Sequence, residues 1–484
     1  MDTLTAHNES VTFIKSAPGE TLMPPPVAAI LFVFGILGLF VLDRDRKVRT
    51  SWALWLPVTW LLIAGSRSVS MWLGMSPAVS ADQYLEGSPI DRAIYLLLVA
   101  AGIIVLLARQ TSVASVLRRN WPILLFVLYC AISITWSDYP FVALKRWIKS
   151  LGDYVMVLIV LTEHDRSHAV KQVLARVGFL LLPLSVLFIN YYPALGRYYA
   201  RHWDSTQFFV GVADNKNMLG MTCMVFGFAA SWRVLEAWSG PRRDRAKALI
   251  VHGTVLAMAI WLLIKSDSKT SLICFVATSG LIAAHTLLKV ARKRVVVHIM
   301  VAVVIVSSFS ALFLGIGGGV LETMGRNSTL TGRTQIWEVL LKVPINPVVG
   351  TGFESFWLGE RLARLWAMPE LYNININEAH NGYLETYLNL GMVGLAFILG
   401  LMATGYRNVL RLLDRDPEVG RLRLGYLVIA VIYNFTEAAI RTTDLVWIAF
   451  ILAIFAYPGR PLARVSESKT RFATAPLVEV EQVV

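Results

Sequence analysis

Thirteen apolar runs recur along the 484-residue chain and constrain its fold more than any other feature. Several are shorter than the roughly 20 residues that a perpendicular membrane helix needs, but flanking residues can lengthen them. The runs predict an all-α, polytopic transmembrane helix bundle of about 12–13 spans. Their approximate bounds are 25–42, 52–65, 93–108, 121–136, 151–162, 177–190, 218–232, 249–264, 271–288, 295–316, 390–406, 424–440 and 445–457.

The composition excludes an ordinary soluble enzyme. Hydrophobic residues make up 56% of the chain and charged residues 16%, whereas soluble domains carry roughly 45–50% and about 25%. The net charge of +13 is therefore interpreted through the preference of basic residues for the cytoplasmic side, not as a sign of nucleic-acid binding. The three cysteines lie in apolar runs, and no residues have metal-ligand spacing, so neither a metal nor a cofactor is expected.

Lysine and arginine predict the orientation of the chain. With the N-terminus outside, 28 of the 45 basic residues fall in cytoplasmic segments, and every such segment is basic. Residues 1–24 are then an extracytoplasmic tail, 25–457 the polytopic membrane domain and 458–484 a cytoplasmic tail. The longest outer connection, 317–389, is predicted to be a functional extracytoplasmic loop, because loops of this length usually act in binding or catalysis.

His380 is the main candidate for proton transfer on the outer face, where His202 is the other histidine. Asn377 is predicted to be an N-cap, which places His380 in the first turn of a helix. The helix dipole there disfavours imidazolium and would keep the ring neutral, as a general base requires. The alternative is a hydrogen-bonded surface histidine, which spacing alone favours.

Several basic residues lie on the outer side, where the orientation rule does not expect them. Cations at this surface can bind a lipid-linked phosphate, although ordinary headgroup contact is the alternative for any single residue. Two of the lysines flank the outer turn 265–270, which is too short to be a mere linker. The residues are Lys145, Arg146, Lys149, Arg197, Arg201, Lys265, Lys269, Arg326 and Arg333.

Glu437 is predicted to lie near the outer end of the twelfth run. An ionisable group so close to the apolar zone is a functional candidate. The alternative is a structural ion pair with Arg441, four residues further on.

Four segments carry distinctive motifs: GRTQIW at 332–337 with NPVVGTG at 346–352, HNGYL at 380–384 with GMVGL at 391–395, SDSKTS at 266–271, and GVADNKNMLG at 211–220. Together they resemble the O-antigen ligase/polymerase superfamily, whose members join lipid-linked glycans outside the cytoplasmic membrane. The resemblance covers roughly residues 120–450, and the overall layout is most similar to exopolysaccharide polymerases of the succinoglycan type. Lys269 departs from the pattern where arginine is usual, and Asn389 departs where an acidic residue is common.

The resemblance implies a glycosyltransferase of the bacterial inner membrane that uses an undecaprenyl-pyrophosphate-linked oligosaccharide. His380 would be the base, and Arg333, Lys269 and Arg197 would stabilise the departing pyrophosphate without a metal. Membrane lipids, chain-length regulators and export proteins are the expected partners, and nucleic acid is not. The full set of substrate-binding candidates is Lys269, Arg197, Lys216, Lys145, Arg146 and Glu437, beside the catalytic pair His380 and Arg333.

Other functions stay open at this point. A polymerase and a ligase differ only in the acceptor, which is another lipid-linked repeat or a lipid A core. A flippase would place polar groups and broken helices in the middle of the membrane, whereas nearly every lysine and arginine here lies in a connection. A non-catalytic scaffold also remains, and it makes no prediction about His380.

Overall fold

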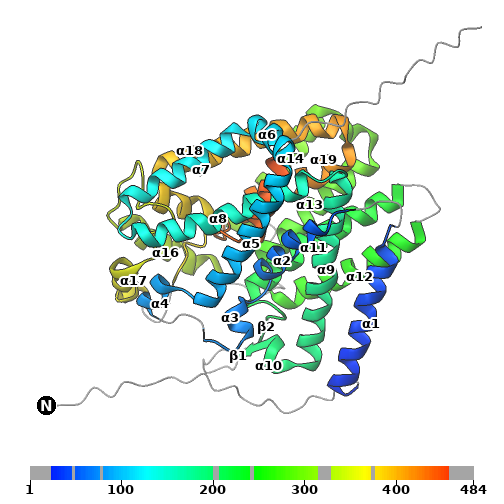
Figure 1. The fold of residues 1–484 in the computed structure, drawn as a ribbon, viewed down its shortest axis with the longest axis horizontal. Coiled ribbons are helices and arrows are strands. Elements are labelled where there is room, and N and C mark those ends of the chain that lie inside the picture. Colours follow the sequence, from blue (N-terminus) through cyan, green and yellow to red (C-terminus); the bar gives the residue numbers. More distant parts are fainter. Residues whose placement is uncertain are drawn as a thin grey trace, which may run out of the picture.

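A computed structural model describes residues 23–45, 50–76, 80–199, 207–239, 245–313, 329–371 and 376–456 (Figure 1). The described residues are mostly helical, with one two-stranded antiparallel ribbon, which confirms the all-α polytopic bundle. The first helices of ten or more residues are α1 (Pro25–Asp43), α2 (Trp55–Ala64), α5 (Pro89–Ala108), α6 (Gln110–Arg119), α7 (Trp121–Ile132), α8 (Pro140–Leu161) and α9 (Arg166–Tyr191). They are followed by α11 (Lys216–Ser239), α12 (Arg245–Ser266), α13 (Lys269–Leu287), α14 (Arg294–Phe313), α16 (Thr329–Lys342), α18 (Gly382–Arg415), α19 (Pro417–Tyr433) and α20 (Leu445–Ile454).

Shorter elements connect the long helices. The short α-helices are α3 (Val69–Trp72), α4 (Ala81–Glu86), α10 (Pro193–Gly196) and α17 (Gly359–Trp366). The 3₁₀ helices are η1 (Trp52–Leu54), η2 (Ser133–Trp136), η3 (Lys289–Arg292) and η4 (Pro369–Leu371). The strands β1 (Arg197–Tyr199) and β2 (Gln207–Phe209) pair in antiparallel register.

Every one of the thirteen apolar runs coincides at least partly with a helix. Eight described helices are long and apolar enough to cross a membrane, or nine if α6 and the α7–η2 unit, which meet at 88°, form one span. The predicted 12–13 spans exceed this number for local reasons. The helices of runs 52–65 and 445–457 are short, and α8 carries four charged side chains among its apolar ones.

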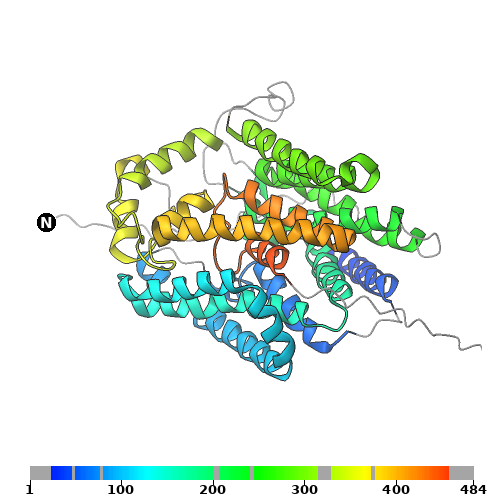
Figure 2. The same cartoon turned by 90° about the horizontal axis from the view of Figure 1, so that it is seen from above.

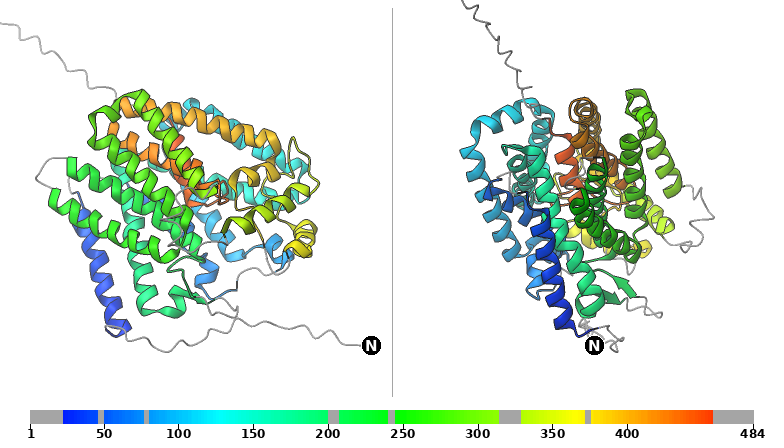
Figure 3. Two further views of the ribbon diagram at one scale, coloured as in Figure 1. Left: turned by 180° about the vertical axis from the view of Figure 1, so that it is seen from behind. Right: turned by 90° about the vertical axis from the view of Figure 1, so that its right-hand side faces the viewer.

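The bundle has a buried centre and an apolar periphery. Most residues in the apolar stretches of α11 and α9 are buried, whereas few of those in the apolar stretches of α1 and α14 are buried. Figure 2 shows the α18–α19 pair between the α7–α8 side and the α13–α14 side of the molecule. Figure 3 shows α1 at one edge, where it contacts α9 and α12. Exposed apolar side chains on such outer helices are expected where lipid is the solvent.

The region predicted to be a long loop, 317–389, contains helices in its described part. Apolar side chains one turn apart, such as Ile336 and Leu340 on α16, pack with residues of α17 and η4 into a second, smaller hydrophobic cluster. Residues 1–22, 314–328, 372–375 and 457–484 lie outside the described part of the chain, so most of the predicted tail 1–24 and all of the predicted tail 458–484 are not described.

A kink in α18 joins two of the sequence motifs. Gly391 has φ 65° and ψ −166°, which a residue with a side chain rarely adopts. The break frees backbone groups that pair with the 346–352 segment: Gly352 N donates to Asn389 O at 2.8 Å and Met392 N donates to Pro347 O at 2.9 Å. The motif segments NPVVGTG and GMVGL are therefore two sides of one packing contact.

Candidate functional site

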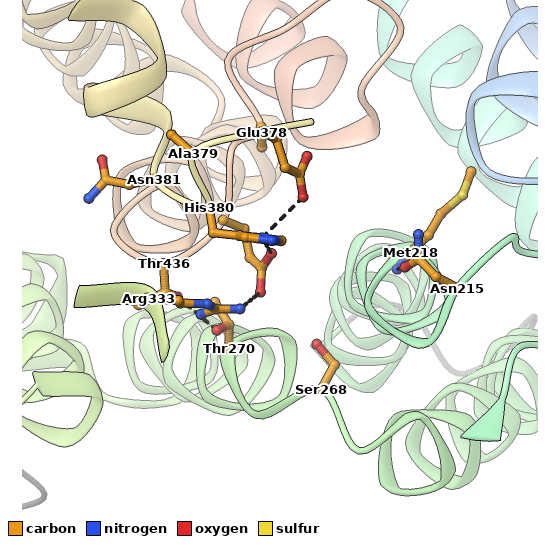
Figure 4. A network of polar contacts seen from close by, with 12 residues as sticks. Asn215, Met218, Ser268, Thr270, Arg333, Glu378, Ala379, His380, Asn381 and Thr436 are labelled. Atoms are coloured by element: carbon orange, nitrogen blue, oxygen red, sulfur yellow. Dashed lines mark hydrogen bonds and ion pairs between the residues drawn. The ribbon is translucent and has the colours of Figure 1, made fainter. Parts of the chain in front are cut away.

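Five charged side chains form an alternating row at one end of the bundle, and Figure 4 shows His380 between Glu378 and Arg333. Arg333 Nη2 lies 2.6 Å from Glu437 Oε1, and Glu437 Oε2 lies 3.5 Å from His380 Nδ1. The same Nδ1 lies 3.1 Å from Glu378 Oε1, and Glu378 Oε2 lies 2.5 Å from Arg441 Nη1. We call Arg333, Glu437, His380, Glu378 and Arg441 the charged row. It brings together three segments that are distant in sequence.

The first of these segments is α16, which carries the GRTQIW motif. Arg333 and Trp337 are one turn apart, so they lie on the same face of the helix. Arg333 contacts Glu437, and Trp337 Nε1 donates a hydrogen bond to the carbonyl of Ala379 at 2.8 Å. Because arginine and tryptophan are four residues apart in the motif, one face of α16 contacts both Glu437 of the charged row and Ala379, the residue before His380.

The second segment, 378–381, leads into α18. The N-cap is Asn381, whose Oδ1 accepts from Tyr383 N and Leu384 N, and not Asn377 as predicted. His380 precedes the helix with φ 47°, a conformation that carries strain for a residue with a side chain. Buried Glu385 fixes this bend, because its Oε2 accepts from Ala379 N at 2.9 Å.

The electrostatics of His380 correct the prediction of a neutral ring. Burial lowers its pKa, but the contacts and charges of Glu378 and Glu437 outweigh burial and raise the pKa to about 9. The same pairing works on Glu378: burial raises its pKa, but Arg441 above all, together with His380, lowers it to about 2. Because two carboxylates face the imidazole, the helix dipole does not set its protonation state.

The third segment, 434–444, is irregular and carries Glu437 and Arg441. Helix α19 ends at Tyr433, so Glu437 lies in a connection and not within a span as run 424–440 predicted. Glu437 pairs with Arg333 and His380, whereas Arg441 pairs with Glu378, which excludes the alternative of a Glu437–Arg441 pair. The i,i+4 geometry that such a pair needs exists only in a helix, and the helix has already ended.

Close packing holds this connection against α18. Gly382 N donates to Asn434 O at 2.9 Å, and a Cβ on Gly382 would lie 1.8 Å from Asn434 Oδ1. Asn434 Oδ1 also accepts from Ala439 N. Glycine after the His-Asn pair of the HNGYL motif is thus required for the two segments of the charged row to approach.

The charged row faces a large cleft of about 1030 Å³. Four of the predicted site residues line it, namely His380, Glu437, Arg146 and Lys216. Arg333 lies behind Glu437, which it contacts. The cleft thus combines the histidine, its carboxylates and cations from α8 and the start of α11, which agrees with a site for an anionic substrate.

Besides Arg333, three predicted residues lie outside the described lining of this cleft. Lys145 extends over the ring of Phe141, with Nζ 4.7 Å from its centroid, because it lies on a different face of α8 from Arg146. Arg197 Nε donates to the carbonyl of Ile189 at 2.8 Å. Lys269 begins α13, beside Thr270, whose Oγ1 lies 2.8 Å from that of Thr436. Lys269 is therefore near the segment that carries Glu437, although it does not face the cleft.

Sequence reasoning missed part of the site. Glu378 and Arg441 are members of the charged row, yet no role was predicted for them beyond Arg441 as a partner of Glu437. Lys149 was noted as an outer basic residue but not chosen as a substrate-binding candidate, yet it lines the cleft together with Arg146. Residues three apart lie on one face of a helix, so helical spacing would have paired Arg146 with Lys149 and not with Lys145. The structure explains the asparagine at position 389. Its Oδ1 accepts from Phe356 N, as a carboxylate also could, but its Nδ2 donates to Glu385 Oε1, and a carboxylate has no hydrogen to donate there.

A second cavity of about 950 Å³ lies between the start of α8, α16 and α17. Among its described lining residues are Tyr139, Arg361 and Glu338, and none of the predicted site residues. The cleft with the charged row is therefore the better candidate for the chemistry.

Glu378, His380 and Glu437 each offer a ligand atom, and these atoms lie within 4.8 Å of one another. The group is thus able to hold a cation, which sequence spacing did not indicate. Both carboxylates, however, already contact an arginine. A metal ion would have to compete with Arg333 and Arg441 for the same oxygens.

Comparison with known proteins identifies the region that holds much of this site. The family model described as O-antigen ligase matches residues 254–399. We refer to these matched residues as the ligase domain. The ligase domain includes Lys269, Arg333 and His380, whereas Glu437, Arg441 and the α8 cations lie outside the matched residues. The cleft is therefore completed by parts of the bundle on either side of the ligase domain.

A curated relative supports the same relationship. The chain is 28% identical over 310 residues to the exopolysaccharide production protein ExoQ of Rhizobium meliloti (strain 1021). The match spans 60% of this chain and 66% of that relative. Together with the matched region and the apolar helices, it supports the resemblance drawn from the motifs: this membrane protein is similar to O-antigen ligases over residues 254–399 and to ExoQ over a longer stretch.

Proposed function

We propose that the protein is a glycosyltransferase that joins polyprenyl-pyrophosphate-linked oligosaccharides in the synthesis of an exopolysaccharide or O-antigen. The observation that carries this proposal is the charged row on the wall of a 1030 Å³ cleft that the ligase domain helps to form. The donor is an undecaprenyl-pyrophosphate-linked repeat and the acceptor is a sugar hydroxyl. The relation to an exopolysaccharide production protein favours a polymerase over a ligase that uses lipid A core.

His380 is proposed as the base. Its Nδ1 faces Glu378 and Glu437, so Nε2 is the atom that would take the proton of the acceptor hydroxyl. The oxygen attacks the anomeric carbon, the bond from that carbon to the pyrophosphate oxygen breaks, and its electron pair leaves with the pyrophosphate. The two carboxylates stabilise the imidazolium that forms, as in other carboxylate–histidine pairs.

Cations that line the cleft are proposed to bind the pyrophosphate. Arg146 donates to the carbonyls of Glu354 and Tyr84 and forms no ion pair within the described part of the chain, so its charge remains available to an anion. Lys149 and Lys216 line the same cleft. Lys216 Nζ lies 3.1 Å from Asp267 Oδ2, but this pair is exposed and screened by solvent, so it leaves Lys216 able to bind an anion. We therefore place Arg146, Lys149 and Lys216 before Arg333, Lys269 and Arg197 as pyrophosphate ligands. Arg333 is already paired with Glu437, and its proposed role is to hold that carboxylate.

The cleft is proposed to face the outside of the bacterial inner membrane, with the N-terminus extracytoplasmic and the C-terminus cytoplasmic. The basic connections 289–294 and 407–423 lie at the opposite ends of α13, α14, α18 and α19, which agrees with this orientation. The pyrophosphate bond supplies the energy, so no nucleotide or cofactor is needed. The arginines beside Glu378 and Glu437 support a reaction that is independent of metal.

The decisive test is the glycan profile of a deletion strain that is complemented with wild type, His380→Ala or His298→Ala. His298 is a matched control, because it contacts Tyr406 far from the cleft. We expect the deletion to leave single repeats on the carrier, and only wild type and His298→Ala to restore polymer. Long polymer that stays on the carrier would indicate a ligase. Full rescue by His380→Ala would favour a flippase or a scaffold.

A further inference from the structure

A small basic pocket of about 290 Å³ lies between the ends of α13, α14, α18 and α19. It is distant from the cleft: His285, in its wall, is fifteen residues along α13 from Thr270, or about 22 Å at the rise of an α-helix. The described lining residues are His285, Arg292, Arg294, Val297, Leu410, Leu413, Asp414, Pro417 and Arg421.

Positive charge in this pocket exceeds negative charge. Three arginines line it, and Asp414 is the one carboxylate among its described lining residues. Asp414 pairs with Arg294, and Arg292 donates to the carbonyl of Thr286. Within the described part of the chain, Arg421 has neither a hydrogen bond nor an ion pair. Arg292 and Arg421 therefore form no ion pair in the described part of the chain, although the charges of Glu418, Glu236 and Asp416 act on Arg421 from a greater distance.

A buried histidine gives an independent sign of a missing partner. His285 is 5% exposed, and its Nδ1 has no hydrogen-bond partner in the described part of the chain. A buried polar atom without a partner costs stability, so such atoms usually have a function. The first turns of α14 and α19 also reach the pocket with Arg294 and Pro417, and helix N-termini attract anions. All of these features favour an anion with several acceptor oxygens.

The surface beside the pocket indicates where that anion comes from. Directly after Arg294, α14 exposes an apolar stripe of Val295, Ile299, Val303 and Val306, each more than half exposed. The spacing of four, four and three residues puts them on one helix face. A free phosphate would make no use of this stripe, whereas acyl chains would lie along it.

We propose that this pocket binds the phosphate of an anionic phospholipid headgroup, with the acyl chains along the exposed face of α14. Arg292 and Arg421 hold the phosphate oxygens, and a headgroup hydroxyl or protonated oxygen reaches His285. A site of this kind ties the basic end of the bundle to the anionic leaflet of the membrane. The proposal does not depend on the glycosyltransferase function.

The test uses the full-length protein in detergent, titrated with phosphatidylglycerol, phosphatidylcholine or inorganic phosphate, and native mass spectrometry measures the bound lipid. We expect phosphatidylglycerol to bind more tightly than phosphatidylcholine. We expect Arg292→Gln and Arg421→Gln each to weaken its binding about fivefold, from the energy of one cation at an anionic membrane surface. Arg292 is exposed, so its replacement leaves folding intact.

Arg411→Gln is the matched control, because Arg411 is an exposed arginine at the same end of α18 but outside the described lining of the pocket. Binding that is unchanged in this variant supports a specific site. If Arg411→Gln weakens binding as much as the pocket variants, general surface charge explains the effect and the proposal fails. Inorganic phosphate that binds to the pocket as well as the lipid would overturn a lipid occupant.

Discussion

The two ends of the helix bundle hold charged side chains in different ways. At the cleft, Arg333, Glu437, His380, Glu378 and Arg441 alternate in sign, and each contacts the next. At the opposite end, three arginines and a histidine meet a single described carboxylate. An alternating row fixes its members in position and sets the protonation of His380, which suits chemistry. An uncompensated cluster attracts an anion from outside, which suits binding.

The largest difference between the two ends should appear when His380 is removed. A positioned general base contributes about 10²- to 10⁴-fold to a rate. We expect His380→Ala to lower glycan transfer by at least the lower value, measured with purified protein and lipid-linked repeats. Arg421→Gln, at the other end, should leave the rate within twofold of wild type. Equal losses in both variants would mean that the two ends do not differ in function.

Arg333 tests whether the row depends on alternation. Removing one partner of a buried ion pair costs about 3–5 kcal/mol, because the other charge is left without compensation. Arg333 and Glu437 are 15% and 8% exposed, so Arg333→Ala should lower both activity and thermal stability strongly. Arg333→Lys, which keeps the charge, should lose less. Transfer rates and melting temperatures that are the same for the two variants would contradict this role.

The pH dependence follows from the raised pKa of His380. Since the two carboxylates raise it to about 9, the neutral ring is scarce at pH 7. A base role predicts a rate that rises about tenfold per pH unit up to about pH 9 in a profile of kcat/KM. A rate that is flat below pH 9 and falls above it would instead assign the imidazolium form to the reaction.

The stability of the fold should fall above neutral pH, where the transfer rate is expected to rise. A raised folded-state pKa stabilises the fold fully below about pH 6.5, and this contribution is lost as the pH rises through about 9. Glu378, with its pKa lowered to about 2, contributes above about pH 4.5 and loses this contribution as the pH falls toward 2. In thermal melts, the charged row should therefore stabilise the fold most between about pH 4.5 and pH 6.5. His380→Ala should abolish the loss of stability that accompanies a rise in pH through about 9.

Lys269 should respond less than any member of the row. It lies outside the described lining of the cleft, so Lys269→Arg keeps the charge near Thr270 without changing a group at the reacting atoms. We expect the rate to change less than about twofold, which corresponds to about 0.4 kcal/mol. A large loss in the same transfer assay would show that Lys269 contacts the substrate.

Chelation should have the smallest effect of all. Arg333 and Arg441 already neutralise the carboxylates of the possible cation group Glu378, His380 and Glu437. Transfer should therefore be unchanged after treatment with EDTA. If EDTA abolishes activity and a divalent cation restores it, the charged row binds a metal ion, and the contrast between an ion-paired row and an anion-binding cluster is wrong.

Local patterns predicted much of the candidate site. Motif order placed Arg333 and His380 in one site, and the structure joins them through Glu437. The basic stretch of α8 was also noticed, but Lys145 was chosen where Lys149 faces the cleft. That error arose because a run of charges does not show which face of a helix points inward.

The sequence by itself determined the all-α membrane bundle, because apolar runs of this length and number have no other stable use than helices in a bilayer. It also indicated His380 through its motif. Only the tertiary structure decided that α19 ends before Glu437, that Arg441 pairs with Glu378 and that His380 is flanked by two carboxylates. The contacts of His380 with Glu437 and of Arg441 with Glu378 join residues tens of positions apart in the sequence. The protonation state of a side chain depends on its neighbours in space rather than in sequence.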